Sequence, residues 1–114
     1  MILAEKAPYQ CLNATEAAAL IRSEPQLRLF DARDLQSYRQ QHLEGAVHLA
    51  EERIGLLLNR LPKDVPVLIY CYHGNASKTC AQTFVDFRFS RVYSADGGYR
   101  PLYHALEGLQ AGSA

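Results

Sequence analysis

Residues 65–71, which read VPVLIYC, are apolar at almost every position. A strand with one solvated face alternates between apolar and polar residues, and this segment does not alternate. Such a run is typical of a central strand of a parallel sheet that is covered by helices on both faces. The segment therefore requires strands beside it and helices above and below it, which limits the chain to an α/β fold.

The rest of the chain supplies those strands and helices in alternation. Further strands are predicted over residues 9–12, 27–32, 45–49 and 91–95, and helices over residues 13–24, 34–40, 51–61, 77–87 and 99–109. Asn13 and Asp34 are expected to cap the first two helices, with Glu16 completing a capping box at the first. We predict one three-layer α/β domain over residues 1–114, with a five-stranded parallel sheet, helices on both faces and a loose tail over residues 110–114.

Composition excludes several classes of function. Twelve Lys and Arg residues balance twelve Asp and Glu residues, so no long-range field favours a nucleic acid or an anionic membrane as partner. The three cysteines, Cys11, Cys71 and Cys80, are an odd number without C-x-x-C spacing, which favours a reducing, cytoplasmic setting. The first residues are too short an apolar run for a signal peptide, and no stretch approaches the roughly 20 apolar residues of a membrane span.

Cys71 is the main candidate for chemistry. In parallel sheets, sites form at the carboxyl ends of strands, and Cys71 ends the central strand. The short loop after it leads into a helix N-terminus, whose free N–H groups and dipole favour an anion. Gly74 and Asn75 tolerate positive φ, so the loop can turn its N–H groups toward the sulfur. We expect the pKa of this thiol to be lowered, in a loop that suits a thiolate or a persulfide.

Each candidate residue also has a structural interpretation. Cys71 could be an inert buried thiol, but the Gly, Asn and Ser that follow it favour a reactive one. Cys11 and Cys80 are interpreted as core residues, and His73 as a solvated loop residue. Asp31 and Arg33 form either a salt bridge on the surface or a charge pair that braces the catalytic face. The other histidines show no ligand spacing, and we expect no metal site; they are His42, His48 and His104.

Three segments together resemble the rhodanese family. CYHGNAS, residues 71–77, resembles the active-site loop of that family, in particular of its small single-domain bacterial thiosulfate sulfurtransferases. FDARDLQSYRQQHLEGAVHL, residues 30–49, is similar to the first family signature, and YSADGGYRPL, residues 93–102, to the C-terminal one. The residues that fit the first signature are Asp31, Arg33, Tyr38, His42, Glu44, Gly45 and Ala46. Three departures are Gln41 for glycine, Leu102 near a usual tryptophan and Ala76 for a hydroxyl residue.

The resemblance implies the strand order 1-5-4-2-3 and a two-step reaction. Cys71 would take a sulfane sulfur from thiosulfate or a similar donor and hold it as a persulfide. Cyanide or a thiol acceptor, such as a thioredoxin-like protein, would then remove it. The implied anion-binding loop is Tyr72, His73, Gly74, Asn75, Ala76 and Ser77, supported by Asp31, Arg33 and Lys78. No metal or organic cofactor is implied.

Two other functions stay open at this point. A phosphatase or arsenate reductase of the same fold resembles H-C-x-x-x-x-x-R, with a loop one residue longer and an arginine that binds the oxyanion. In this chain Tyr70 precedes the cysteine and Ser77 stands where the arginine would be. The third possibility is a sulfur carrier or interaction module without turnover. Modules of that kind have typically lost the cysteine, which this chain keeps.

Overall fold

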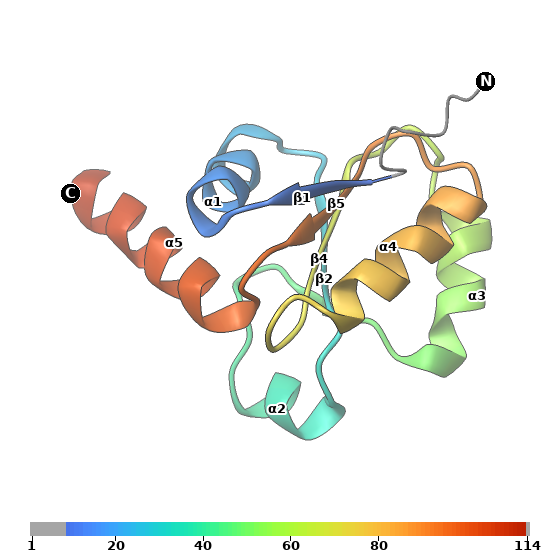
Figure 1. Ribbon diagram of the computed structural model, residues 1–114, viewed down its shortest axis with the longest axis horizontal. Coiled ribbons are helices and arrows are strands. Elements are labelled where there is room, and N and C mark those ends of the chain that lie inside the picture. Colours follow the sequence, from blue (N-terminus) through green and yellow to red (C-terminus); the bar gives the residue numbers. More distant parts are fainter. Residues whose placement is uncertain (1–8, 114) are drawn as a thin grey trace.

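The computed structural model describes residues 9–113 of the protein, with side chains through residue 107. Strands and helices alternate along this part of the chain (Figure 1). The strands are β1 (Gln10–Leu12), β2 (Arg28–Asp31), β3 (Val47–His48), β4 (Val67–Tyr70) and β5 (Val92–Ala95). The helices are α1 (Ala14–Ser23), α2 (Leu35–Gln40), α3 (Glu51–Arg60), α4 (Ala76–Asp86) and α5 (Tyr99–Ser113).

The strands form one parallel sheet in the order β1-β5-β4-β2-β3. Both the parallel sheet and this order confirm the prediction. β4 lies at the centre, and all four of its residues are buried, because helices cover both of its faces. Within the sheet β1 is an edge strand that pairs with β5 only.

Helices cover the two faces of the sheet in pairs. Figure 1 shows α1 and α5 on one side and α3 and α4 on the other, with α2 beyond the ends of β2 and β4. Alternate residues of β4 serve the two layers, since successive side chains point to opposite faces. Val67 and Ile69 pack in the core under α3 and α4, and Leu68 and Tyr70 in the core under α1 and α5.

Helices α1 and α2 begin at the capping residues that the sequence indicates. Asn13 caps α1 in a capping box, because its side chain accepts the N–H of Glu16 and the Glu16 side chain accepts the N–H of Asn13. Asp34 caps α2 by accepting the N–H of Ser37 at 3.0 Å. Both caps were predicted. None of the described helices is both long and apolar enough to cross a membrane.

Three expectations from the sequence differ from the structure or fall outside the described residues. α5 continues through Ser113, so the tail predicted over residues 110–114 is wrong for residues 110–113. The physical reason is that no proline interrupts this segment, and its one glycine, Gly112, disfavours a helix without forbidding it. Cys11 is exposed rather than part of the core, because β1 is a short edge strand. The interpretation of the N-terminal segment falls largely on residues 1–8, which lie outside the described residues.

Candidate active site

Cys71 follows β4 directly and begins the loop that leads into α4. Its side chain is buried, with 3% of the residue exposed. Gly74 in this loop has φ +104°, as the sequence predicted for that position. Asn75, which is also a residue type that tolerates positive φ, does not use that freedom and has φ −88°. Gly74 alone makes the turn, and Asn75 can then adopt the helical conformation from which α4 begins.

The loop directs hydrogen-bond donors at the sulfur of Cys71. The N–H groups of Gly74 and Ser77 lie 3.1 Å and 3.3 Å from Sγ. The Ser77 hydroxyl lies 3.5 Å from the same atom. Ser77 is in the first turn of α4, where backbone N–H groups have no carbonyl partner within the helix. The predicted arrangement of a helix N-terminus above the sulfur is therefore present.

These donors determine the ionisation of Cys71. Burial raises the pKa of the thiol, since it disfavours the charged form. Hydrogen bonds from the hydroxyl and N–H of Ser77, and then from the N–H groups of Gly74 and His73, lower it. The result is a pKa below the ordinary value for cysteine. A buried thiol with a lowered pKa is the chemical signature of a nucleophile.

The other two cysteines have the opposite shift. Partial burial and the nearby Asp96 carboxylate raise the pKa of Cys11, although Lys78 partly opposes them. Burial, then the charge of Cys71 and that of Glu51, raise the pKa of Cys80. Cys80 is partly buried and packs against the core under α3 and α4, as expected from the sequence. Cys71 is therefore the one cysteine with a lowered pKa.

The turn between β5 and α5 supports the Cys71 loop from behind. The N–H of Tyr99 donates to the Cys71 carbonyl at 2.7 Å. Gly98, with φ +80°, approaches so closely that a Cβ atom there would lie 2.0 Å from the Tyr72 carbonyl oxygen. Sequence reasoning quoted the double glycine only as part of a family signature and gave it no role. The glycines were the available signal, but the contact depends on β5 lying beside β4.

A second residue that sequence reasoning missed is Ser94 in β5. It is fully buried, and its hydroxyl lies 2.8 Å from the Ser77 hydroxyl. A polar residue inside an apolar strand was the only sign of it in the sequence.

Asp31 and Arg33 form a buried ion pair beside the loop. Arg33 Nε and Nη2 lie 3.1 Å and 2.8 Å from the Asp31 carboxylate, and Arg33 Nη2 also donates to the Gln41 carbonyl. Asp31 is fully buried and Arg33 is 8% exposed, so the interpretation as a surface salt bridge is wrong. The guanidinium lies 4.0 Å from the centroid of the Tyr99 ring. This contact joins the pair to the turn that supports Cys71.

The remaining predicted residues lie further from the sulfur. Tyr72 is half exposed, and its hydroxyl bonds to Asp34 and Ser37, which joins the loop to α2. The hydrogen bond from Tyr72, and then those from Ser37, hold the pKa of Asp34 at about 2. His73, Asn75 and Ala76 are also exposed. Lys78 is partly buried, and its charge lowers the pKa of Cys11.

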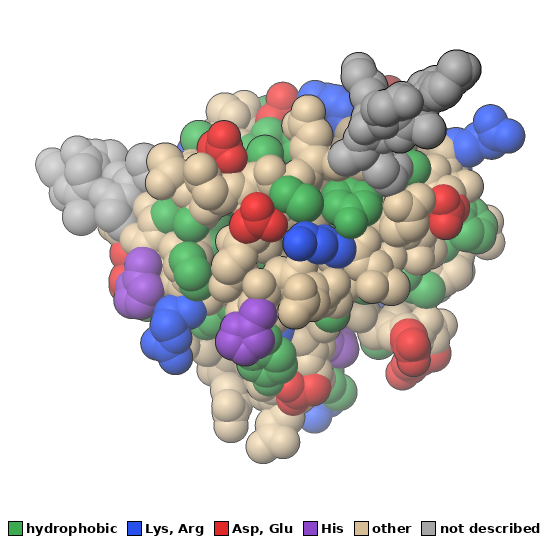
Figure 2. Space-filling view, in the orientation of Figure 1, with side chains coloured by type: hydrophobic (Ala, Val, Ile, Leu, Met, Phe, Trp, Pro, Cys, Tyr) green, Lys and Arg blue, Asp and Glu red, His purple; other side chains and the backbone are tan. Residues whose placement is uncertain are grey.

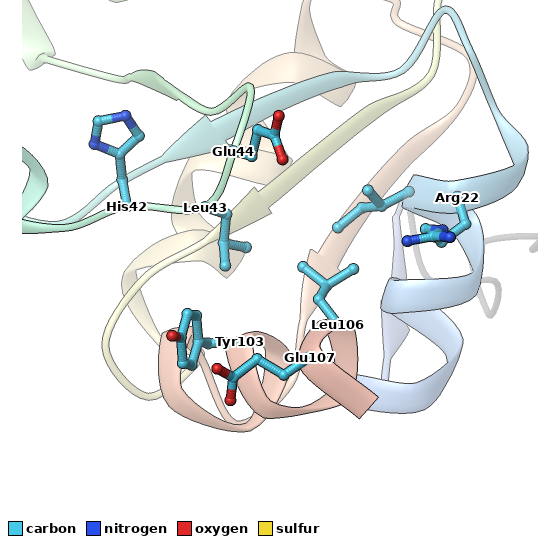
Figure 3. Close-up of a pocket in the computed structure, with 8 residues that line it drawn as sticks. Arg22, His42, Leu43, Glu44, Tyr103, Leu106 and Glu107 are labelled. Atoms are coloured by element: carbon cyan, nitrogen blue, oxygen red, sulfur yellow. The ribbon is translucent and has the colours of Figure 1, made fainter. Parts of the chain in front are cut away.

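Two hollows in the surface differ in their relation to Cys71. A cavity of about 560 Å³ borders the loop, and Tyr72, His73, Arg33, Tyr99 and Arg100 are among its lining residues. Its lining holds arginine side chains and no carboxylate, which suits an anionic donor. A smaller cavity of about 350 Å³ lies between α1, α5 and residues 42–44 (Figure 3). No loop residue lines the smaller cavity, so it is separate from the thiol.

The face shown in Figure 2 carries charges of both signs. Figure 2 shows Lys and Arg side chains interspersed with Asp and Glu on one face, in keeping with the balanced composition. Within residues 9–113, no three His, Cys, Asp or Glu side chains lie close enough to share a metal ion. The expectation of a reaction without cofactor stays a prediction.

The fold and the cysteine loop together define the class of protein. A family model described as the rhodanese-like domain matches residues 13–105, most of the chain. This chain belongs to the rhodanese family. The thiosulfate sulfurtransferase GlpE of Tolumonas auensis is 36% identical to it over 93 residues, which cover 82% of this chain and 87% of that protein.

Solved structures show the same fold at low identity. A human single-domain sulfurtransferase superposes with a TM-score of 0.72 at 17% identity, covering 87% of this chain and 97% of the other. A Rhodopseudomonas palustris protein of unknown function, described as a possible tyrosine phosphatase, gives a TM-score of 0.73 at 17% identity, with 92% and 95% covered. Because proteins described in such different terms share the fold, the active-site loop must decide the chemistry.

Proposed function

We propose that this protein is a thiosulfate sulfurtransferase that carries a sulfane sulfur on Cys71. The observation that carries the proposal is the set of donors around Sγ, from Gly74 and Ser77, which lowers the pKa of a buried thiol. Membership of the rhodanese family and the similarity to the Tolumonas auensis enzyme support it.

The proposed reaction has two displacement steps. The Cys71 thiolate attacks the outer sulfur of thiosulfate, the bond between the two thiosulfate sulfurs breaks, and its electron pair leaves with sulfite. Cys71 then carries a persulfide. Cyanide, or the thiolate of an acceptor such as a thioredoxin-like protein, attacks the outer sulfur and displaces the Cys71 thiolate. This is covalent catalysis by an activated nucleophile, and it predicts ping-pong kinetics.

The protein's own groups would serve both steps. The N–H groups that face Sγ stabilise the negative charge on the thiolate and on the persulfide, at positions fixed before reaction. The arginine-containing cavity beside the loop supports an anionic donor. A reducing, cytoplasmic setting is part of the proposal, supported by three cysteines that are all free.

The phosphatase alternative lacks its central residue. A Cys-dependent phosphatase requires an arginine that binds the phosphoryl oxygens, and the corresponding position here is the fully buried Ser77. The next residue is Lys78, and its charge lowers the pKa of Cys11. We therefore propose sulfur transfer rather than phosphoryl transfer for this loop.

The test measures sulfite and thiocyanate released from thiosulfate and cyanide. We expect turnover by the intact protein and by Cys11→Ser, and none by Cys71→Ser. Mass spectrometry after thiosulfate treatment is expected to show one added sulfur atom on Cys71. Hydrolysis of an aryl phosphate that depends on Cys71, without any persulfide, would establish the phosphatase instead. A persulfide without turnover would identify a sulfur carrier.

A further inference from the structure

Two serine hydroxyls form a line behind the sulfur of Cys71. Ser77 Oγ lies 3.5 Å from Cys71 Sγ and 2.8 Å from Ser94 Oγ. Both serines are fully buried. The line therefore runs from the loop after β4, through the first turn of α4, to β5, and it is closed to solvent at the Ser94 end.

The strand register explains why Ser94 reaches this position. Ser94 is the neighbour of Ile69 across the β4–β5 pair, and neighbouring residues in a parallel sheet point to the same face. Ile69 belongs to the core under α3 and α4. Ser94 thus places a hydroxyl in an apolar layer, where an unpaired polar group would be costly, and Ser77 is its partner.

Counting hydrogens shows which form of Cys71 this line fits. The three atoms are joined by two contacts, and each contact uses one hydrogen. With Cys71 as a thiol there are three hydrogens for two contacts, and among the described residues Ser94 has no further hydrogen-bond partner. With Cys71 as a thiolate there are two hydrogens for two contacts. Ser94 then donates to Ser77, and Ser77 donates to the sulfur.

We propose that Ser94 is a positioning residue that donates to Ser77 and so directs the Ser77 hydroxyl at Cys71 Sγ. Its role in catalysis rests on the proposed sulfur transfer. Sγ bears no hydrogen in the thiolate, because the thiol proton has left to solvent. It bears none in the persulfide either, because its second bond is to the outer sulfur. The same two hydrogen bonds therefore persist through both displacement steps.

The groups around Cys71 agree with this assignment. Burial raises its pKa, and the Ser77 hydroxyl is first among the hydrogen bonds that lower it. Cys80 of α4, whose pKa is raised, is a titratable neighbour that feels the charge of Cys71. Without Ser94, the Ser77 hydroxyl is free to rotate toward other acceptors, such as a carbonyl in the preceding turn.

The experiment measures the thiolate of Cys71 directly and needs no sulfur donor. The rate of iodoacetamide alkylation is followed against pH by mass spectrometry of the peptide that contains Cys71. Removing the hydroxyl in Ser77→Ala should lower the thiolate fraction at neutral pH about tenfold or more, as expected for a hydrogen bond to a charged group. Ser94→Ala should lower it about threefold, because Ser94 acts only through its neighbour.

The double variant is the decisive measurement. If Ser94 acts through Ser77, then Ser94→Ala added to Ser77→Ala has no further effect on the alkylation profile. Ser94→Thr, which keeps a hydroxyl, should restore the profile of the unmodified protein. Ser90→Ala, which removes an exposed hydroxyl, is the control and should change nothing. If Ser94→Ala does not fold, Ser94→Cys, with a weaker donor of similar size, is used in both backgrounds and should show a shift in the same direction.

Two results would overturn the assignment. One is an unchanged Cys71 profile in the folded Ser94 variant, which would make Ser94 a packing residue only. The other is an equal shift with and without Ser77, which would mean that Ser94 acts by another route. Because alkylation requires neither thiosulfate nor an acceptor, failure of the proposed sulfur transfer would appear separately, as absent sulfite release with the profile unaffected.

Discussion

Cys11 lies in edge strand β1 and Cys71 directly follows central strand β4, and the less accessible of these two thiols has the lower pKa. Cys71 is 3% exposed and has a lowered pKa, whereas Cys11 is exposed and has a raised pKa. If exposure alone decided reactivity, Cys11 would be the more reactive of the two thiols. Burial raises the pKa of both thiols, and the difference lies in the groups near each sulfur, which are N–H and O–H donors at Cys71 and the Asp96 carboxylate at Cys11.

The origin of the donors is the backbone. At Cys71 the strand has ended, Gly74 turns the chain back, and the N-terminus of α4 leaves its N–H groups free for the sulfur. At Cys11 the backbone is still part of β1 and is paired with β5. Side chains in a strand project from the faces of the sheet, whereas its backbone N–H groups lie in the plane of the sheet, so the strand does not direct N–H groups at the Cys11 sulfur.

The largest expected effect on stability and on Cys71 reactivity comes from a substitution at Gly98, which lies behind the Cys71 loop. In Gly98→Ala the new Cβ would meet the Tyr72 carbonyl at 2.0 Å, so the loop must move. We expect a loss of unfolding free energy of about 3 kcal/mol or more, together with slower alkylation of Cys71 and unchanged alkylation of Cys11. Chemical denaturation and peptide mass spectrometry measure the two effects.

Gly97→Ala is the matched control for that variant. Gly97 also has positive φ, +82°, but a Cβ there would meet only the Pro101 side chain, at 3.2 Å. The expected loss is about 1 to 2 kcal/mol, from backbone strain alone. Equal losses in the two variants would show that the close contact behind the loop is unimportant.

A second effect is expected from the ion pair that contacts the supporting turn. In Asp31→Asn the buried Arg33 loses its charged partner, which should cost about 3 kcal/mol of unfolding free energy. Because Arg33 packs on Tyr99, whose N–H binds the Cys71 carbonyl, alkylation of Cys71 should also slow. Glu24→Gln removes the partly exposed partner of the exposed Arg91 and should cost under about 1 kcal/mol. A Cys71 that reacts normally in Asp31→Asn would separate the ion pair from the site.

The pH dependence of alkylation compares the pKa values of Cys71 and Cys11 in the unmodified protein. A lowered pKa puts the Cys71 thiolate at lower pH than an ordinary cysteine, and a raised pKa puts that of Cys11 at higher pH. Below its pKa, a thiol gains about tenfold in thiolate per pH unit. The ratio of Cys71 to Cys11 alkylation should therefore fall by roughly tenfold or more between about pH 6 and about pH 10. A constant ratio would contradict the opposite shifts.

The smallest effect is expected on the Cys11 side. Asp96→Asn removes the carboxylate that disfavours the Cys11 thiolate, so the pKa of Cys11 should decrease. We expect alkylation of Cys11 at neutral pH to increase about twofold, since the site is exposed and screened by solvent. Alkylation of Cys71 serves as the internal reference in the same sample. An unchanged or decreased rate at Cys11 would contradict the assignment of its raised pKa to Asp96, whose charge and hydrogen bond both disfavour the thiolate.

Sequence reasoning succeeded where a feature is local. The apolar run 65–71 predicted a buried central strand, and the caps at Asn13 and Asp34 needed only neighbouring residues. The turn at Gly74 and the helix N-terminus beside Cys71 could be predicted because the strand end, the glycine and the helix start lie within a few residues of one another. The strand order was predicted correctly only because the family resemblance implied it.

It failed where a feature depends on which strands are neighbours. The exposure of Cys11 follows from the edge position of β1, and the roles of Ser94 and Gly98 follow from β5 lying beside β4. The sequence also did not show that Gly74 alone makes the turn and that Asn75 is already helical. These contacts join segments far apart in the chain, and no local pattern encodes them.

The close approach of Gly98 to Tyr72 limits how the length of the Cys71 loop can change. The two turns meet at backbone atoms, and the Tyr99 N–H fixes the Cys71 carbonyl between them. A residue inserted between Cys71 and Ser77 would widen the Cys71 loop, and its backbone would then clash with the turn at residues 97–99. Converting this loop to the longer phosphatase form would therefore require a compensating change around residues 97–99, so the two turns must be redesigned, or must diverge, together.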